Sequence, residues 1–229
     1  MRVRFWLSTP TTSKLWYTSF AMTDPLTLLL GNQARVRLLR MFLFNPSKQY
    51  SVEEIIRRAR LVRRTARTEL NVLERSGLIR KRQVLETVGK TTRRAAGYGL
   101  DDKSPLARSL QTFLFETAPI DGKNLQSHLK GVGKIQVLVA AGVFMNEFDR
   151  RIDVLVAVEK LQASKVESAI RVLEAELGVE IKYAAFSTKD LLYRFSMHDK
   201  LTRDVFDYPH ELLIDKVGVR DEIKRPIAR

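Results

Sequence analysis

Residues 62–82 read VRRTARTELNVLERSGLIRKR, and this stretch decides how the first half of the chain folds. At about 100° per residue, a helical wheel gathers one set of side chains on one side, namely Val62, Ala66, Glu69, Leu70 and Leu73. The opposite side carries a polar set, namely Arg64, Arg67, Thr68, Asn71 and Arg75. The pattern predicts a helix over residues 62–76, closed by Gly77, because glycine readily adopts the left-handed conformation of a helix end. We expect the first side to pack and the arginine side to face outward.

The segments before this stretch predict two more helices. Apolar residues at helical spacing over 32–44 predict a first helix, which ends at Asn45. Ser51 opens a Ser-Val-Glu-Glu sequence that matches a capping box, in which the serine hydroxyl accepts a backbone N–H and Glu54 reaches back to the cap. A second helix then runs to about Ala59, and a short turn joins it to the third. Two helices joined by such a turn can deliver the second of them into a DNA major groove.

The chain after the third helix predicts a basic hairpin, with strands over about 78–85 and 95–100 and a tip over 89–94. Together with the three helices, this hairpin resembles the winged helix-turn-helix domain of bacterial and archaeal transcription regulators, over about residues 26–100. The most specific part is the pattern EL..LE.SGLI at 69–79. The resemblance implies that the third helix reads the major groove of double-stranded DNA. It also implies that the hairpin, called the wing in that family, contacts the neighbouring sugar-phosphate backbone or minor groove of the DNA.

The residue types on these two elements suggest different roles on DNA. Arginine can donate two hydrogen bonds to guanine, asparagine can pair with adenine, and threonine can bond to either a base or a phosphate. The candidate base-reading residues are therefore Arg63, Arg64, Arg67, Thr68 and Asn71. The basic residues of the hairpin are expected to meet phosphates, which fixes position without reading sequence; they are Arg80, Lys81, Arg82, Lys90, Arg93 and Arg94. One alternative stays open, in which the arginine side is only a charged, solvated face.

Charge is divided unevenly along the chain. Residues 1–100 hold 20 Lys and Arg against 6 Asp and Glu, whereas residues 101–229 hold 20 of each kind. Such an asymmetry points to a nucleic acid or an anionic membrane surface, but a membrane surface is disfavoured because the small core needs the apolar side of the third helix. The absence of cysteine excludes disulfides, cysteine-ligated zinc and thiol catalysis. No apolar run reaches about 18 residues, so we expect no membrane span and a cytoplasmic location.

The second half of the chain predicts a small mixed α/β unit. Its expected elements are a helix over 104–117, a short helix around 125–129, strands over 134–141, 151–158 and 179–186, and a helix over 161–177. This region resembles a minimal nucleotidyltransferase domain of the DNA polymerase β type over about residues 121–215. The resemblance lies in the order of the sequences IQVLVAAGVF and RRIDVLVAVEKL, then a helix, then a region that starts VEIKYAAFSTKD. In that family a Gly-Ser turn helps to hold the nucleotide, and two acids at alternate positions on the next strand share two magnesium ions.

This chain departs from the family pattern at both places. At the turn, Gly142 matches, but Val143 stands where the serine would help to hold the phosphates. On the next strand, Asp153 matches the second acid, but Arg151 occupies the position of the first. Residues two apart on a strand point the same way, so we expect Arg151 to pair with Asp153 and to repel a metal ion. We therefore predict no catalytic residue, no metal ion and no cofactor.

Together these inferences predict an α+β fold. The expected domains are a flexible leader over 1–24, a winged helix-turn-helix over 25–100, a linker helix over 101–120, a nucleotidyltransferase-like domain over 121–217 and a flexible tail over 218–229. The function expected first is a sequence-specific transcription regulator that binds double-stranded DNA, with an inactive C-terminal domain. We expect a homodimer, because such regulators read two half-sites about one helical turn apart, and an unknown effector or protein partner is left open. Two alternatives remain: an active magnesium-dependent nucleotidyltransferase that the winged helix targets, and a winged-helix protein that acts on RNA or on another protein.

Overall fold

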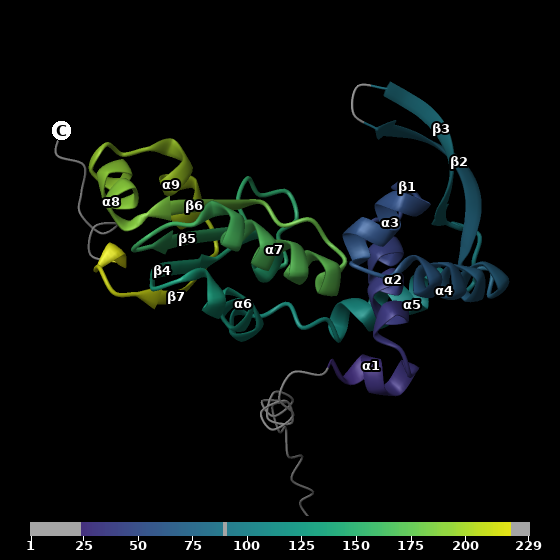
Figure 1. Ribbon diagram of the computed structural model, residues 1–229. Coiled ribbons are helices and arrows are strands. Elements are labelled where there is room, and N and C mark those ends of the chain that lie inside the picture. Colours follow the sequence, from purple (N-terminus) through teal and green to yellow (C-terminus); the bar gives the residue numbers. More distant parts are fainter. Residues whose placement is uncertain (1–23, 89–90, 221–229) are drawn as a thin grey trace, which may run out of the picture.

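The computed structural model describes residues 24–88 and 91–220, and Figure 1 traces their path. Lys90, nearly all of the expected leader, and residues 221–229 lie outside the described residues. Within the described ranges the protein is a mixed α+β chain with nine α-helices and two β-sheets, so the predicted α+β class is confirmed. None of the helices in these ranges is long and apolar enough to span a membrane.

The first half begins with four helices and one short strand, which are α1 (Pro25–Leu30), α2 (Gln33–Leu43), β1 (Gln49–Ser51), α3 (Val52–Ala59) and α4 (Arg63–Arg75). α2 begins where Asn32 Oδ1 accepts the N–H of Ala34 at 2.8 Å, and α3 begins where Ser51 Oγ accepts the N–H of Glu54 at 3.1 Å. The expected capping box is only half formed, because the Glu54 carboxylate pairs with Arg58 one turn further along α3.

A long hairpin follows α4 and consists of β2 (Ile79–Val88) and β3 (Thr91–Leu100). β3 lies between β1 and β2, and the three strands are antiparallel. Pairing continues from Ile79 with Leu100 to Val88 with Thr91, so the strands extend further into the expected basic tip than the sequence predicted. In Figure 1 the hairpin projects away from α3 and α4.

The first core lies between α2, α3, α4 and the base of this sheet, around the fully buried Phe42. α5 (Ala107–Glu116) joins the same core through Leu114, which is also fully buried. The Gln111 side chain donates a hydrogen bond to the backbone oxygen of Leu43 at 2.8 Å. The expected cap, Ser104, lies before the helix, which has no side-chain cap. The segment expected as a linker helix is therefore packed on the first core.

The second half holds α6 (Gly122–Leu129), β4 (Ile135–Ala140), β5 (Val154–Val158), α7 (Ala163–Leu177), β6 (Tyr183–Ser187), α8 (Thr188–Ser196), α9 (Lys200–Phe206) and β7 (Glu211–Asp215). The sheet order is β6-β5-β4-β7, with β5 and β6 parallel and the other neighbours antiparallel. Leu138 and Val156 pack with α6 and α7, whereas Val139 and Leu155 pack with α8 and α9. The two central strands are thus covered on both faces, as their nearly continuous apolar sequence requires.

The chain stays packed beyond β7. The Asp215 carboxylate accepts backbone N–H groups from the residues that follow, at 2.8 Å from Gly218 and 3.1 Å from Arg220. Val219 is fully buried in the core beside α8 and α9. The segment expected as a flexible tail from residue 218 is therefore packed as far as residue 220, where the description ends.

The two halves meet where α2 packs against the end of α7, a contact that we call the α2–α7 junction. Arg40 on α2 is 1% exposed, and its Nη1 donates to the backbone oxygen of Glu176 at 3.0 Å and to the Asp24 carboxylate. Asn45 donates to the backbone oxygen of Gly178 at 2.7 Å. Gly178 has a φ of 73°, and a Cβ there would lie 2.6 Å from the Arg40 Cβ. Glycine therefore meets two needs at once, the left-handed backbone and the close approach.

Candidate nucleic-acid interface

α4 is held in place by the side of the helix that was predicted to pack. Ala66 and Leu70 are buried almost completely. Glu69 is also buried, at 4% exposed, because its carboxylate accepts hydrogen bonds from Asn32 Nδ2 at 2.6 Å and Arg35 Nε at 2.8 Å. Both donors lie at the start of α2, so Glu69 fixes the position of α4 relative to α2.

The opposite side of α4 is open to solvent. Its exposed side chains are Arg64, Arg67, Thr68, Asn71 and Arg75. The predicted orientation of the helix is confirmed, apart from Val62, which lies at the N-cap and is 73% exposed. Neither Arg64 nor Arg67 forms an ion pair with any residue that the structure describes. The helix therefore presents unneutralised guanidinium groups, and the second half of the chain does not cover them.

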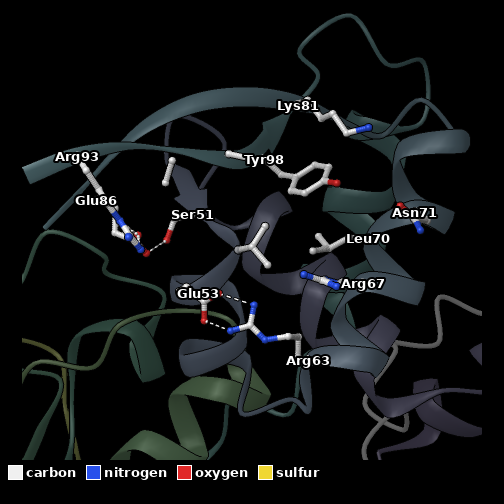
Figure 2. A pocket seen from close by; sticks show the side chains of 13 residues that line it. Ser51, Glu53, Arg63, Arg67, Leu70, Asn71, Lys81, Glu86, Arg93 and Tyr98 are labelled. Atoms are coloured by element: carbon white, nitrogen blue, oxygen red, sulfur yellow. Dashed lines mark hydrogen bonds and ion pairs between the residues drawn. The ribbon is translucent and has the colours of Figure 1, made fainter. Parts of the chain in front are cut away.

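A groove of about 410 Å³ lies between α4, the start of α3 and the hairpin (Figure 2). Five of the candidate DNA-contacting residues line it, namely Arg63, Arg67, Asn71, Lys81 and Arg93. The structure thus brings base-reading candidates on α4 together with phosphate-binding candidates on the hairpin. Arg64 and Thr68 lie on the exposed side of α4 but do not line the groove.

Two cations of the groove are paired with carboxylates on neighbouring elements. Arg63 donates from both Nη atoms to Glu53 in the first turn of α3, at 2.6 and 2.7 Å. Lys81 Nζ lies 3.1 Å from Glu74 Oε1 on α4, and this hydrogen bond raises the pKa of Lys81. Such exposed pairs add little to stability, but in the structure each one places a charged group beside a carboxylate.

Glu86 on β2 connects the hairpin to the start of α3. Its Oε1 accepts from Ser51 Oγ at 2.8 Å, and its Oε2 accepts from Arg93 Nε and Nη2 at 3.2 and 3.0 Å. These hydrogen bonds, the one from Ser51 first, lower the pKa of Glu86, so its carboxylate stays ionised near neutral pH. Sequence analysis missed both Glu86 and Glu53. The signal for Glu53 was its place in the first turn of α3, which faces the start of α4. The signal for Glu86 was its pairing with Arg93 across the hairpin, but the strands were predicted too short to include it.

The remaining basic residues of the hairpin differ in exposure. Arg94 is exposed, and in the described part of the chain it has no ion-pair partner. Arg80 and Arg82 are half-buried, and Arg80 Nη1 lies 3.7 Å from Asp101. Lys90, the sixth phosphate-binding candidate, lies outside the described residues. Among the described cations of the hairpin, Arg94 is therefore one that is both exposed and without an ion pair.

The nucleotidyltransferase-like positions lie in the turn after β4 and just before β5. Asp153 is 1% exposed, and its two oxygens accept backbone N–H groups from Val143 at 3.0 Å and Lys182 at 2.8 Å. Burial raises the pKa of Asp153, although these hydrogen bonds oppose the shift. Gly142 has a φ of 50°, and a Cβ there would lie 2.0 Å from Asp153 Oδ1. Asp153 therefore acts as a structural group that closes the turn onto β5.

The expected pairing of Arg151 with Asp153 is wrong. β5 starts at Val154, so the residues before it do not follow strand alternation, and Arg151 Nη1 lies 3.5 Å from Asp204 on α9 instead. A cleft of about 330 Å³ in this region is lined by Arg151 and Asp204 but not by Asp153. The magnesium ions that the resemblance implies do not fit these residues, because the one matching carboxylate is buried and engaged by backbone donors. Over residues 24–88 and 91–220, no group of three or more His, Asp or Glu side chains is placed to hold a metal ion.

Comparison of the chain with known protein-family models gives no match, and a search of curated protein sequences gives none either. The residues of the groove are therefore what indicates its function. They combine exposed guanidinium groups, an exposed amide on the same helix side, and a basic hairpin beside them.

Proposed function

We propose that this protein is a sequence-specific DNA-binding regulator. In this proposal residues 25–100 are a winged helix-turn-helix, α4 enters the major groove and the β2–β3 hairpin is the wing. One observation carries the proposal: the exposed side of α4 holds Arg64 and Arg67 without an anionic partner among the described residues. The groove next to that side continues to the cations of the hairpin.

The residue types on α4 support duplex DNA as the ligand. The major groove of B-DNA is about 12 Å wide and admits an α-helix. Its base edges offer the two acceptors of guanine, which arginine can bind, and the donor and acceptor of adenine, which asparagine can bind. Arg67 and Asn71 lie one helical turn apart on the exposed side, so they can meet neighbouring base pairs. Because Arg64 and Arg67 have no described internal partner, their contact with DNA breaks no ion pair.

The distribution of charge supports the same ligand. The 20 basic residues of the first 100 face only 6 acids, whereas the rest of the chain is balanced. Neutralising phosphates releases counterions, and this supplies much of the affinity of a DNA-binding protein. We expect the first half to supply most of the electrostatic attraction.

We propose that the C-terminal domain does not transfer nucleotides and serves instead in partner contact or assembly. Support comes from Asp153, whose carboxylate is buried and accepts two backbone N–H groups, and from Arg151, which pairs with Asp204. The domain contacts α2 at the α2–α7 junction, and Glu69 fixes α4 on that same helix. A partner of this domain is therefore well placed to influence the reading helix.

Selection of bound sequences from a random duplex library, with the full chain, tests the proposal. We expect an enriched motif, and we expect Arg64→Ala combined with Arg67→Ala to weaken binding to that motif by roughly 30-fold or more. This magnitude follows because each lost base contact costs about 1–3 kcal/mol. The matched control is Lys165→Ala combined with Lys189→Ala, which removes two exposed cations from the C-terminal domain and is expected to leave affinity unchanged.

The proposal fails if no motif is enriched, or if the Arg64 and Arg67 double variant binds the selected duplex like the wild type. A structured RNA included as a competitor distinguishes the remaining alternative. Equal binding of RNA and duplex without sequence preference would favour an RNA-binding protein over a transcription regulator.

A further inference from the structure

The groove beside α4 contains carboxylates as well as cations. Glu53 and Glu86 both line it, and Figure 2 shows each of them pointing at an arginine. A phosphate that entered the groove would meet these negative charges. The edge of a base is neutral overall and offers donors and acceptors instead. Beside Arg63 and Arg93, the two acids therefore favour a base edge over a phosphate, whereas Arg67 and Lys81 keep the lining of the groove net positive.

The pairing of Arg63 with Glu53 leaves part of the guanidinium free. A guanidinium carries five N–H donors in a planar fork. Glu53 takes one donor from each Nη atom, so the Nε–H and the outer Nη2–H, which point in the same direction, keep no carboxylate partner in this pair. The Arg63 side chain remains 53% exposed while it is paired with Glu53. Two parallel donors are what a bidentate contact with guanine requires.

The cations of α4 thus fall into two kinds. Arg64 and Arg67 have no ion-pair partner within the described ranges, so each brings a full charge to the DNA. Arg63 is neutralised by Glu53 before DNA arrives and can offer directed hydrogen bonds but little net charge. A protein can discriminate between two ligands by attracting the right one or by repelling the wrong one, and naturally specific interfaces use both.

We propose that Glu53 is a specificity-determining residue of the interface and acts by positioning Arg63. Its carboxylate keeps the Arg63 charge from neutralising a phosphate and directs the free donors of Arg63 to a base edge. The inference rests on the proposed function and adds a named discriminating group to it. Its effect is expected in the ratio of affinities for two duplexes, rather than in affinity for the selected duplex alone.

The test compares wild type and Glu53→Gln on the selected duplex and on a scrambled duplex of the same composition, at several salt concentrations. Glutamine keeps the shape of the side chain and removes its charge, so the Arg63 charge becomes available to a phosphate. We expect the slope of log affinity against log salt on the scrambled duplex to steepen by about 0.9, the value for one more neutralised phosphate. This slope corresponds to roughly a 3- to 4-fold greater loss of affinity between about 50 and 200 mM salt. The ratio of selected to scrambled affinity is expected to fall.

A matched control removes the same charge elsewhere. Glu167→Gln breaks an exposed pair with Arg171 on α7, in which the two side chains are 48% and 63% exposed, and it lies in the second half of the chain. This variant is expected to leave both the slope and the ratio unchanged. Arg63→Lys is a second probe, because it removes the bidentate pair with Glu53 without changing the net charge. It is expected to lower the ratio of selected to scrambled affinity as well.

Each outcome has a distinct meaning. If wild type selects a motif but Glu53→Gln leaves the slope and the ratio unchanged, the inference is overturned and the proposed function stands. If Glu53→Gln has the same effect in an Arg63→Ala background, Glu53 does not act through Arg63 and the inference is also overturned. If wild type selects no motif, the proposed function fails and the inference fails with it. Circular dichroism of every variant confirms that the compared chains are folded.

Discussion

Replacing Gly178 with alanine is expected to destabilise the protein at the α2–α7 junction. Gly178 combines a φ of 73° with close contact to α2, because an added Cβ would lie 2.6 Å from both the carbonyl carbon and the Cβ of Arg40. The Met41 backbone nitrogen would lie at 2.7 Å. Two of these three atoms are backbone atoms, so the clash cannot be relieved by rotating a flexible side chain alone.

The magnitude follows from two contributions. A residue with a Cβ costs about 1–2 kcal/mol in the left-handed conformation. Forcing extra atoms into a packed contact costs about 1–3 kcal/mol more. Gly178→Ala should therefore lower the free energy of unfolding by roughly 2–5 kcal/mol, a large share of the 5–15 kcal/mol of a typical domain.

Two other glycines separate these contributions in urea unfolding experiments. Gly77 has a φ of 72° and open space around it, so Gly77→Ala should show only the conformational cost of about 1–2 kcal/mol. Gly131 has neither a left-handed φ nor a neighbour within 4 Å of the added Cβ, so Gly131→Ala should change stability by less than about 1 kcal/mol. If Gly178→Ala costs no more than Gly77→Ala, the close packing of α2 against residue 178 does not constrain the fold, and the reasoning is refuted.

Three further predictions concern the second half of the chain and its assembly. His128 Nε2 lies 3.1 Å from Glu176 Oε2, and this hydrogen bond raises the pKa of His128 despite its burial. The pair therefore stabilises the fold fully below the ordinary histidine pKa of about 6.5 and progressively less as pH rises through the raised pKa. His128→Gln should remove this pH dependence of stability in thermal unfolding. An unchanged pH profile in the variant would contradict the role given to His128. Asp153→Ala should lower the free energy of unfolding by roughly 2–5 kcal/mol, because it leaves the buried N–H of Val143 and the half-buried N–H of Lys182 without their acceptor. Calorimetry should give the same response to Mg²⁺ for this variant and the wild type, whereas a magnesium-dependent transfer product lost in the variant would overturn the non-catalytic proposal. Light scattering at micromolar concentration should give the mass of two 26.3 kDa chains plus one duplex in the presence of DNA, and a single chain with and without DNA would remove the dimer proposal.

α4 could be predicted from the sequence to within one residue, because three independent signals agree there. The packing side, the arginine side and the closing glycine all fall in the same 15-residue window, residues 62–76 with Gly77 after it. β1 could not be predicted in this way, since Gln49–Ser51 is too short to show alternation. The hairpin strands were predicted too short because the polar residues near the tip, such as Arg93 and Arg94, look like a turn although they pair across the hairpin.

The groove could be predicted only in part. A helical wheel gives the directions of Arg67 and Asn71, because it depends on the period of one helix alone. The pair between Arg63 and Glu53 depends on how the turn sets α3 against α4, and Arg60 in that turn adopts a φ of 53° that no periodicity indicates. The role of Asp153 was missed for a similar reason, since strand alternation was applied to residues that precede the strand.

The α2–α7 junction also affects the entropy of association. The buried Arg40, held by a carboxylate of the first half and a backbone oxygen of the second, joins the two halves before any ligand binds. A partner bound at α4 therefore immobilises both halves as one body, and the loss of translational and rotational freedom is incurred once. If a flexible linker joined the same two halves, a complex that fixed the second half would lose additional translational and rotational entropy. With the halves already joined, less of the contact free energy is offset in this way.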